Sequence, residues 1–240
     1  MNSDQQRFFE LDLLRGIAII LMIVFHFFFD LNYFGILQNE MYQGFWLIFQ
    51  RTTASLFLLL VGISLSISYS KSSKFQKFFK RAITLFGIGL LITLVTWIYP
   101  GKGFIVFGII HLIAVSILLS YFFQKFYKLN LIFGLAILAL GTWIGLNSIT
   151  LSIPWLLWAG LPPVNFYTLD YFPIFPWFGI ILIGMFIGKT IYPNGKRKFE
   201  LREPNTRLAK GMQWLGKQSL MIYLIHQPTI IGILYLVGLI

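Results

Sequence analysis

Long stretches without Asp, Glu, Lys or Arg alternate along the chain with short polar segments. A transmembrane helix needs about 20 apolar residues to cross the hydrocarbon layer of a bilayer. The stretches lack the strict polar–apolar alternation of barrel strands, so we interpret them as helices. The uncharged stretches cover residues 16–29, 52–70, 82–101, 103–124, 129–169, 171–188 and 218–240.

The run 129–169 is long enough for two crossings, but three prolines interrupt its second half. We therefore predict one helix at 129–148 and an interfacial or re-entrant segment at 150–169, where tryptophans suit the membrane interface. The chain is thus expected to be all-α, a single polytopic transmembrane helix bundle over residues 1–240 with about seven spans. These predicted spans are approximately 11–31, 46–69, 82–99, 104–123, 129–148, 173–191 and 217–238.

Composition supports this interpretation. Of the 240 residues, 58% are hydrophobic and 11% charged, against about 45–50% and about 25% in soluble domains. This excludes an ordinary soluble globule and a disordered chain. The absence of cysteine excludes disulfide and thiolate chemistry. With three histidines and eight carboxylates the chain is poorly supplied for a metal centre, and we expect no metal site.

The net charge of +11 is explained by membrane topology. With the N-terminus in the cytoplasm and the C-terminus outside, seven spans place sixteen of the 19 basic residues on the cytoplasmic side, as the positive-inside rule requires. We therefore expect the lipid bilayer as a partner and no nucleic acid. A secondary attraction for anionic lipid or an anionic cytosolic ligand follows from the same charge.

Ionisable residues inside or beside the predicted spans are the candidates for chemistry. Such groups are costly in lipid and usually face the bundle interior or a water-filled cavity. We expect several of them to gather toward the outer side of the membrane. The candidates are Arg15, His26, Asp30, Arg51, His111, Asp170 and His226.

Three of these candidates share one stripe of the first helix. Arg15 and His26 are eleven residues apart, nearly three turns, which corresponds to a rise of roughly 16 Å. Asp30 follows His26 at i+4, so the two side chains can touch. An arginine near the cytosolic end suits a phosphate-bearing group, and a deep imidazole suits proton transfer or nucleophilic attack. One long ligand could contact both.

Structural interpretations remain open beside these. Arg15 can anchor the helix at the interface, paired with Asp12, and Arg51 can extend to the outer interface. Asp30 can be an exposed helix-end residue, and each histidine a packed interior side chain. Gly184 and Gly188 have the spacing of helix-packing glycines.

Several stretches resemble a known group of membrane enzymes. Glu10–Ala18 followed by His26 looks like the opening of the transmembrane acyltransferase superfamily, and Arg15-x10-His26 is similar to the signature of its acyltransferase-three branch. Three further stretches resemble prokaryotic proteins grouped with the catalytic domain of heparan-α-glucosaminide N-acetyltransferase. They are Phe107–Leu112, Asp170–Gly179 and Leu215–Pro228.

The resemblance implies an N- or O-acetyltransferase in a prokaryotic cell membrane. It would move an acyl group, expected to be acetyl, from cytosolic acyl-CoA as co-substrate to an extracytoplasmic sugar or glycan. No permanently bound cofactor is expected, and a homo-oligomer is left open. The resemblance carries the catalytic histidine onto His26 and the acyl-donor contact onto Arg15.

The remaining roles are hypotheses from the residue types. Asp30 would orient the ring of His26. Substrate binding or oxyanion stabilisation would fall to the other four candidates, which are Arg51, His111, Asp170 and His226. A proton-coupled transporter is the alternative function, because intramembrane His and Asp also build proton relays. A structural membrane protein is the third hypothesis.

Overall fold

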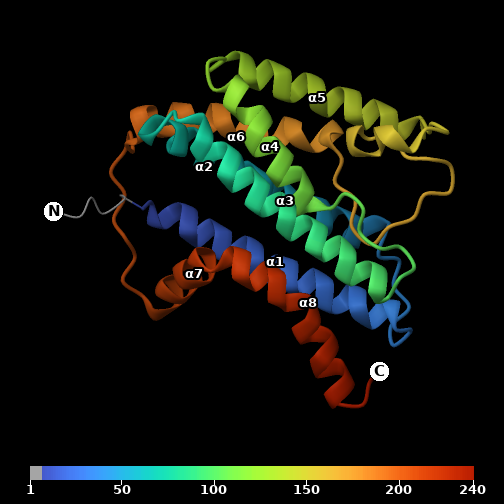
Figure 1. The fold of residues 1–240 in the computed structure, drawn as a ribbon. Helices are drawn as coiled ribbons and strands as arrows, with labels where there is room; N and C mark the ends of the chain where they lie inside the picture. The colour runs from blue at the N-terminus through green and yellow to red at the C-terminus, as the bar shows by residue number, and fades with distance from the viewer. Residues whose placement is uncertain (1–6) are drawn as a thin grey trace. The chain divides into compact units, whose positions relative to one another are not determined.

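The computed structural model describes residues 7–240, which form α-helices joined by loops (Figure 1). This confirms the all-α class. Phe107 and Tyr171 form one isolated β-bridge among these residues. The elements are α1 (Phe9–Tyr33), α2 (Gly44–Lys71), α3 (Phe75–Ile98), α4 (Ile109–Phe123), α5 (Leu129–Leu146), the 3-10 helix η1 (Pro154–Ala159), α6 (Ile174–Ile191), the 3-10 helix η2 (Pro193–Gly195), α7 (Arg207–Lys217) and α8 (Ser219–Leu236).

Among the described residues, six helices are long and apolar enough to cross a membrane, namely α1, α2, α3, α5, α6 and α8. The chain is therefore an integral membrane protein. The seventh predicted span corresponds to α4, which is apolar but has only 15 residues. It begins at Ile109 rather than near 104, because the preceding residues bond to another segment of the chain: Leu169 N–H donates to Gly103 O at 2.7 Å. The count of seven spans stays a prediction.

The segment 150–169 contains no long helix. Its only regular element is η1, which packs on α6 and ends at Gly160 in the left-handed region (φ 114°). The proline-rich sequence explains this, because proline removes a backbone donor and disfavours a helix at the residue before it. The interfacial and the re-entrant interpretations both remain predictions.

One helix was not predicted. The hydrophilic stretch after residue 193 ends in α7, whose N-cap Thr206 accepts a hydrogen bond from the backbone N–H of Ala209 at 3.2 Å. Ala209, Gln213 and Gly216 form its buried face. Basic residues lie between these buried positions, so the amphipathic pattern does not form an uncharged run and was not predicted.

The described residues divide into two compact units. The terminal unit comprises the residues up to Leu60 together with Leu201–Ile240, and the central unit comprises Val61–Glu200. Helix α2 contributes its first part to the terminal unit and its last part to the central unit. The prediction of a single domain stays a prediction.

In the terminal unit, α1 packs against both α7 and α8 (Figure 1). Gly16 and Gly216 make the contact with α7 close, because a Cβ at Gly16 would overlap the backbone of Met212 and a Cβ at Gly216 that of Asp12. Farther along α1, an apolar cluster joins it to α8 through Leu31, Ile230 and Leu234. α1 is therefore held along its length by the C-terminal helices.

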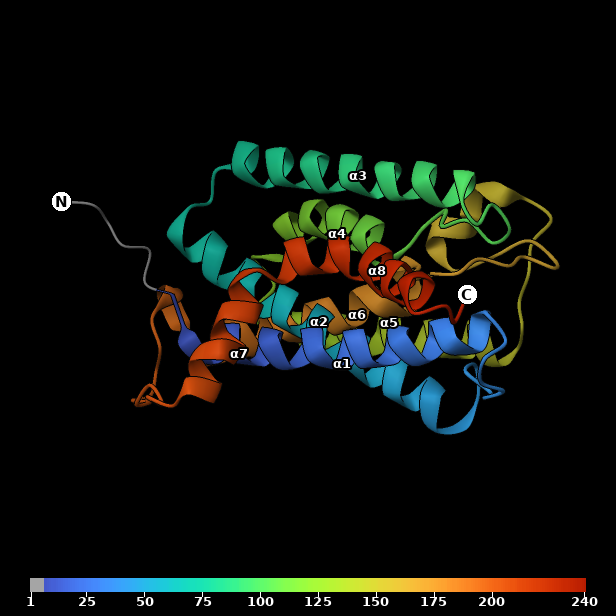
Figure 2. The same cartoon turned by 90° about the horizontal axis from the view of Figure 1, so that it is seen from below.

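In the central unit, α3 packs along α4 (Figure 2), and α5 packs along α6. The last part of α2 also contacts α6 closely, since a Cβ at Gly62 would meet Gly184 and one at Gly188 would meet Ser66 and Ile63. This confirms the interpretation of Gly184 and Gly188 as packing glycines.

Candidate active site

Two histidines from sequence-distant helices meet in the terminal unit. His26 on α1 and His226 on α8 have ring centroids 4.7 Å apart, with the ring planes at 80°. His226 is 8% exposed, whereas His26 is half-buried. The structure thus brings together two of the predicted site residues that are 200 positions apart.

Both rings are held by carbonyl groups of their own helices. Nδ1 of His26 lies 2.9 Å from Met22 O, and Nδ1 of His226 lies 2.6 Å from Tyr223 O. A carbonyl oxygen only accepts hydrogen bonds, so the neutral ring carries its proton on Nδ1 and has a lone pair on Nε2. Nε2 of His226 is buried without a partner among the described residues. Each ring therefore presents a basic nitrogen away from its own backbone.

Asp30 makes no hydrogen bond to His26, contrary to the prediction that it orients the ring. It is 2% exposed, and its Oδ1 accepts a hydrogen bond from Nε2 of Gln227 on α8 at 2.7 Å. Its Oδ2 and Oε1 of Gln227 are buried without partners in the described part of the chain. The i,i+4 spacing correctly placed Asp30 on the same side of α1 as His26, but the carboxylate bonds across to α8. The backbone of Met22 orients His26 instead.

Gln227 is a site residue that the sequence reasoning missed. It directly follows His226 in the stretch Leu215–Pro228, which was singled out for its histidine alone. An amide next to an intramembrane histidine was the available signal, since polar side chains within a span seldom face lipid.

Arg15 lies nearer the start of α1 and is paired. Its Nη1 donates to Oδ1 of Asp12 at 2.7 Å, with side-chain exposures of 26% and 6% respectively. The pairing that was left open as a structural alternative is thus present. Arg15 still has an exposed portion through which it can meet an anion.

Arg51 lies in the N-terminal part of α2 and is exposed. No hydrogen bond or ion pair with another residue in 7–240 fixes its side chain in place. The structure does not bring it into the cluster of His26, His226, Asp30 and Gln227.

His111 and Asp170 form a separate cluster, in the central unit. The N–H of Gly108 donates to Nδ1 of His111 at 3.3 Å, and Nε2 lies 3.4 Å from the hydroxyl of Thr93. That hydroxyl donates its proton to Ile105 O at 2.7 Å, so Nε2–H of His111 must be the donor to Thr93. Both ring nitrogens are therefore occupied in holding the start of α4.

Asp170 serves the same helix start. Its Oδ2 accepts from the N–H of Ile109, the first residue of α4, at 3.0 Å, where a carboxylate also complements the helix dipole. Gly108 must be a glycine here, because a Cβ would overlap this carboxylate. The two motif stretches beginning at Phe107 and Asp170 thus contact each other at the start of α4.

Burial raises the pKa of Asp170 to about 6, although the hydrogen bond from Ile109 opposes this. The folded state then binds more protons than the unfolded state between about pH 4 and pH 6, so stability is highest at low pH and falls as pH rises through that window. Between pH 5 and pH 7 the loss is about 1 kcal/mol. We expect the melting temperature of the purified protein to fall by about 3 °C over this interval.

The variant Asp170→Asn isolates this effect, because its amide oxygen can still accept from Ile109 while it cannot ionise. Its melting temperature should change less between pH 5 and pH 7 than that of the wild type, as followed by intrinsic fluorescence on heating. An equal pH dependence in both proteins would contradict the assignment to Asp170.

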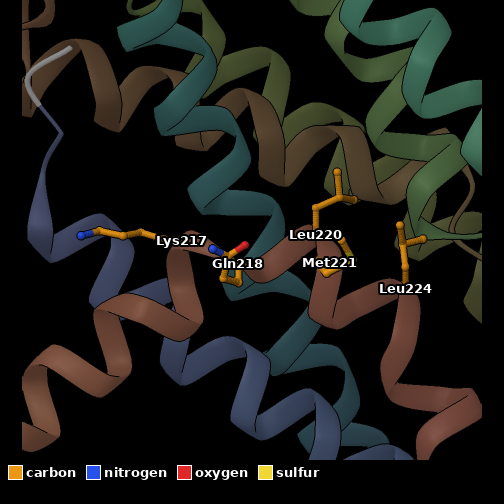
Figure 3. A pocket seen from close by; sticks show the side chains of 5 residues that line it. All are labelled: Lys217, Gln218, Leu220, Met221 and Leu224. Atoms are coloured by element: carbon orange, nitrogen blue, oxygen red, sulfur yellow. The ribbon is translucent and has the colours of Figure 1, made fainter. Parts of the chain in front are cut away.

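A pocket of about 270 Å³ opens where α7 meets α8 (Figure 3). Lys217 and Gln218 supply a cation and an amide, and three apolar side chains continue the lining along α8. His226 follows the last of them, Leu224, by two residues. The apolar residues of the lining are Leu220, Met221 and Leu224.

No group of three His, Asp or Glu side chains within residues 7–240 could hold a metal ion.

Comparison with known proteins bears on this site. The family model described as heparan-alpha-glucosaminide N-acetyltransferase, catalytic, matches residues 7–228, nearly the whole chain. The search of curated proteins and that of solved structures gave no match. The family match implies a membrane N-acetyltransferase whose donor is acetyl-CoA and whose acceptor is a glucosaminide. With the helical membrane fold, the chain belongs to the family of heparan-alpha-glucosaminide N-acetyltransferase catalytic domains.

Proposed function

We propose that the protein transfers an acetyl group from cytosolic acetyl-CoA to the amino group of a sugar on the opposite side of the membrane, with His26 as the catalytic residue. The observation that carries the proposal is the His26 ring inside a membrane-spanning helix. Its Nδ1 donates to Met22 O, so the lone pair on Nε2 is available to take a proton or to attack the thioester.

His26 can serve in either of two routes. In the one-step route, Nε2 takes a proton from the amino group as its nitrogen attacks the thioester carbon, the C–S bond breaks, and the thiolate of CoA leaves and takes up a proton. In the two-step route, Nε2 itself attacks the thioester carbon, and the resulting acetyl-imidazole passes the acetyl group to the amine. Labelled acetyl trapped on His26 would favour the second route.

The donor would enter from the side of Arg15 and Lys217. Arg15 lies three turns before His26, a rise of roughly 16 Å, and its partial exposure leaves room for a phosphate contact beside its pair with Asp12. The pocket at Lys217 offers a second cation, followed by an apolar wall that suits the pantetheine arm of CoA. Both paths lead along a helix toward the histidine pair.

The other predicted site residues take different roles in this proposal. His111 and Asp170 would act as structural residues of α4, because both ring nitrogens of His111 and Oδ2 of Asp170 are already bonded there. Arg51 keeps the role of a charged donor for substrate or oxyanion, since its guanidinium is exposed. Asp30 would bind the acceptor rather than orient His26.

A label-transfer assay distinguishes this proposal from a proton-coupled transporter. Purified protein is supplied with acetyl-labelled acetyl-CoA and D-glucosamine, and product and free CoA thiol are measured. We expect labelled N-acetylglucosamine to form together with an equal amount of CoA thiol. Movement of glucosamine or of another solute across vesicles without any acetylated product would overturn the proposal in favour of transport.

A further inference from the structure

We propose that His226 is a second catalytic base, which removes the first proton from the ammonium form of the acceptor before His26 assists its attack. This inference rests on the proposed function and assigns a role to a second histidine of the same site. Of the two roles that we expected for His226, substrate binding and oxyanion stabilisation, it keeps the first and argues against the second.

The hydrogen bond at Nδ1 argues against oxyanion stabilisation by His226. Stabilising an oxyanion requires a donor, and the N–H of the neutral His226 ring is already given to Tyr223 O at 2.6 Å. What remains is the lone pair of Nε2, which is buried and has no partner in residues 7–240. His226 therefore meets a bound ligand as a hydrogen-bond acceptor and a base.

The groups around His226 favour a ligand with several hydrogen-bond donors. Three buried atoms without a partner in the described part of the chain lie on the side chains of this cluster: Nε2 of His226, Oδ2 of Asp30 and Oε1 of Gln227. All three are hydrogen-bond acceptors, and burying them unpaired is costly. An ammonium group supplies three N–H donors and a positive charge beside the carboxylate of Asp30, whereas a hydroxyl supplies one donor.

The proximity of the two rings lets one substrate nitrogen serve both. Their centroids are 4.7 Å apart, so the two rings are in contact and a nitrogen bound against one ring lies beside the other. Two helices pack against α8, and all three carry titratable or charged groups. On α1 these are Glu10, Asp12, Arg15, His26, Asp30 and Tyr33, on α7 they are Arg207, Lys210 and Lys217, and on α8 itself they are Tyr223 and Tyr235. Among these, His26 is the group in ring contact with His226 from another helix.

Proton balance explains why two bases are useful. Acetylation of an ammonium group, R–NH3+ with acetyl-CoA, gives the amide R–NH–acetyl, CoA thiol and one free proton. The nitrogen must therefore break two N–H bonds. We assign the first proton to Nε2 of His226, which later releases it to water. The second passes to His26 during attack on the thioester carbon, and from there to the CoA thiolate as the C–S bond breaks.

The variant His226→Asn tests this assignment. Asparagine places an N–H near the position of Nδ1, so it can keep the bond to Tyr223 while the base at Nε2 is lost. We expect its kcat/KM for D-glucosamine to fall about 10²-fold at about pH 6. The defect should shrink to below about fivefold by about pH 9, where free amine replaces the ammonium form and the first proton no longer needs a base.

The matched control is Thr229→Ala on the same helix. It removes a side-chain bond to a carbonyl of α8, that of Ile225, at an exposed position. We expect this variant to keep the wild-type pH profile. If His226→Asn fails to fold, His226→Gln gives the same test, because its amide reaches the Nε2 position without being a base.

Three results are decisive. An equal loss at every pH would mean that His226 is only structural, and wild-type rates at about pH 6 would mean that it takes no proton; both would overturn this inference while the proposed function stands. A wild-type protein that forms no N-acetylglucosamine at any pH would overturn the proposed function itself, and this inference with it.

Discussion

His26→Asn is expected to reduce acetyl transfer about 10³-fold while leaving the fold intact. The physical reason is that asparagine can replace the Nδ1–H donor to Met22 O but has no counterpart of Nε2. The helix bond is therefore kept, and the base or nucleophile is lost. The measurement is the rate of labelled N-acetylglucosamine formation from acetyl-CoA, with the melting temperature recorded on the same preparation.

Phe27→Ala is the control for this variant. Phe27 is the next residue of α1 and is 40% exposed, so its truncation perturbs the same turn without touching the histidine pair. It should keep turnover within a few-fold of wild type. If His26→Asn retained most of the activity with an unchanged melting temperature, His26 would not be catalytic, whatever its position.

The spans could be predicted because membrane crossing imposes a length and a composition that are visible without tertiary structure. Predicted and observed ends agree to within about five residues except at the start of α3, which begins at Phe75 rather than at 82, and the break after the helix at 129–148 is also found. The start of α4 could not be predicted in this way. It is set by hydrogen bonds of His111 and Asp170 with the first turn, and Asp170 lies about sixty residues along the chain from the residue that it binds. α7 was missed because its stability comes from packing on α1 rather than from an uncharged run.

The site could be predicted only as far as single-helix periodicity reaches. The stripe of Arg15, His26 and Asp30 followed from the 3.6-residue turn, whereas the direction of each polar group did not. Asp30 bonds to Gln227 instead of His26, and His26 meets His226, because α8 packs along α1 at this depth. Periodicity contains no information about which helix becomes the neighbour.

The same limit applies to the chemical role of each histidine. The sequence distinguished His26 from the other two histidines but left His111 and His226 with the same candidate roles, and the hydrogen bonds separate these two. His111 uses both ring nitrogens in its own unit, whereas His226 uses Nδ1 and retains a buried Nε2. Which nitrogen is free depends on backbone carbonyls a turn away, and it decides whether a ring can act as donor or base.

Transfer across the membrane is the central claim, and sided vesicles test it most directly. Acetyl-labelled acetyl-CoA, which cannot cross a bilayer, is added outside vesicles that contain the protein and enclose a glucosamine oligosaccharide too polar to leave. The two substrates then meet only through protein molecules whose donor face points outward. We predict labelled N-acetyl product inside the vesicles with the wild type and none with His26→Asn. Product that forms only when both substrates share one side, or lumenal product with His26→Asn at the wild-type rate, would contradict the account.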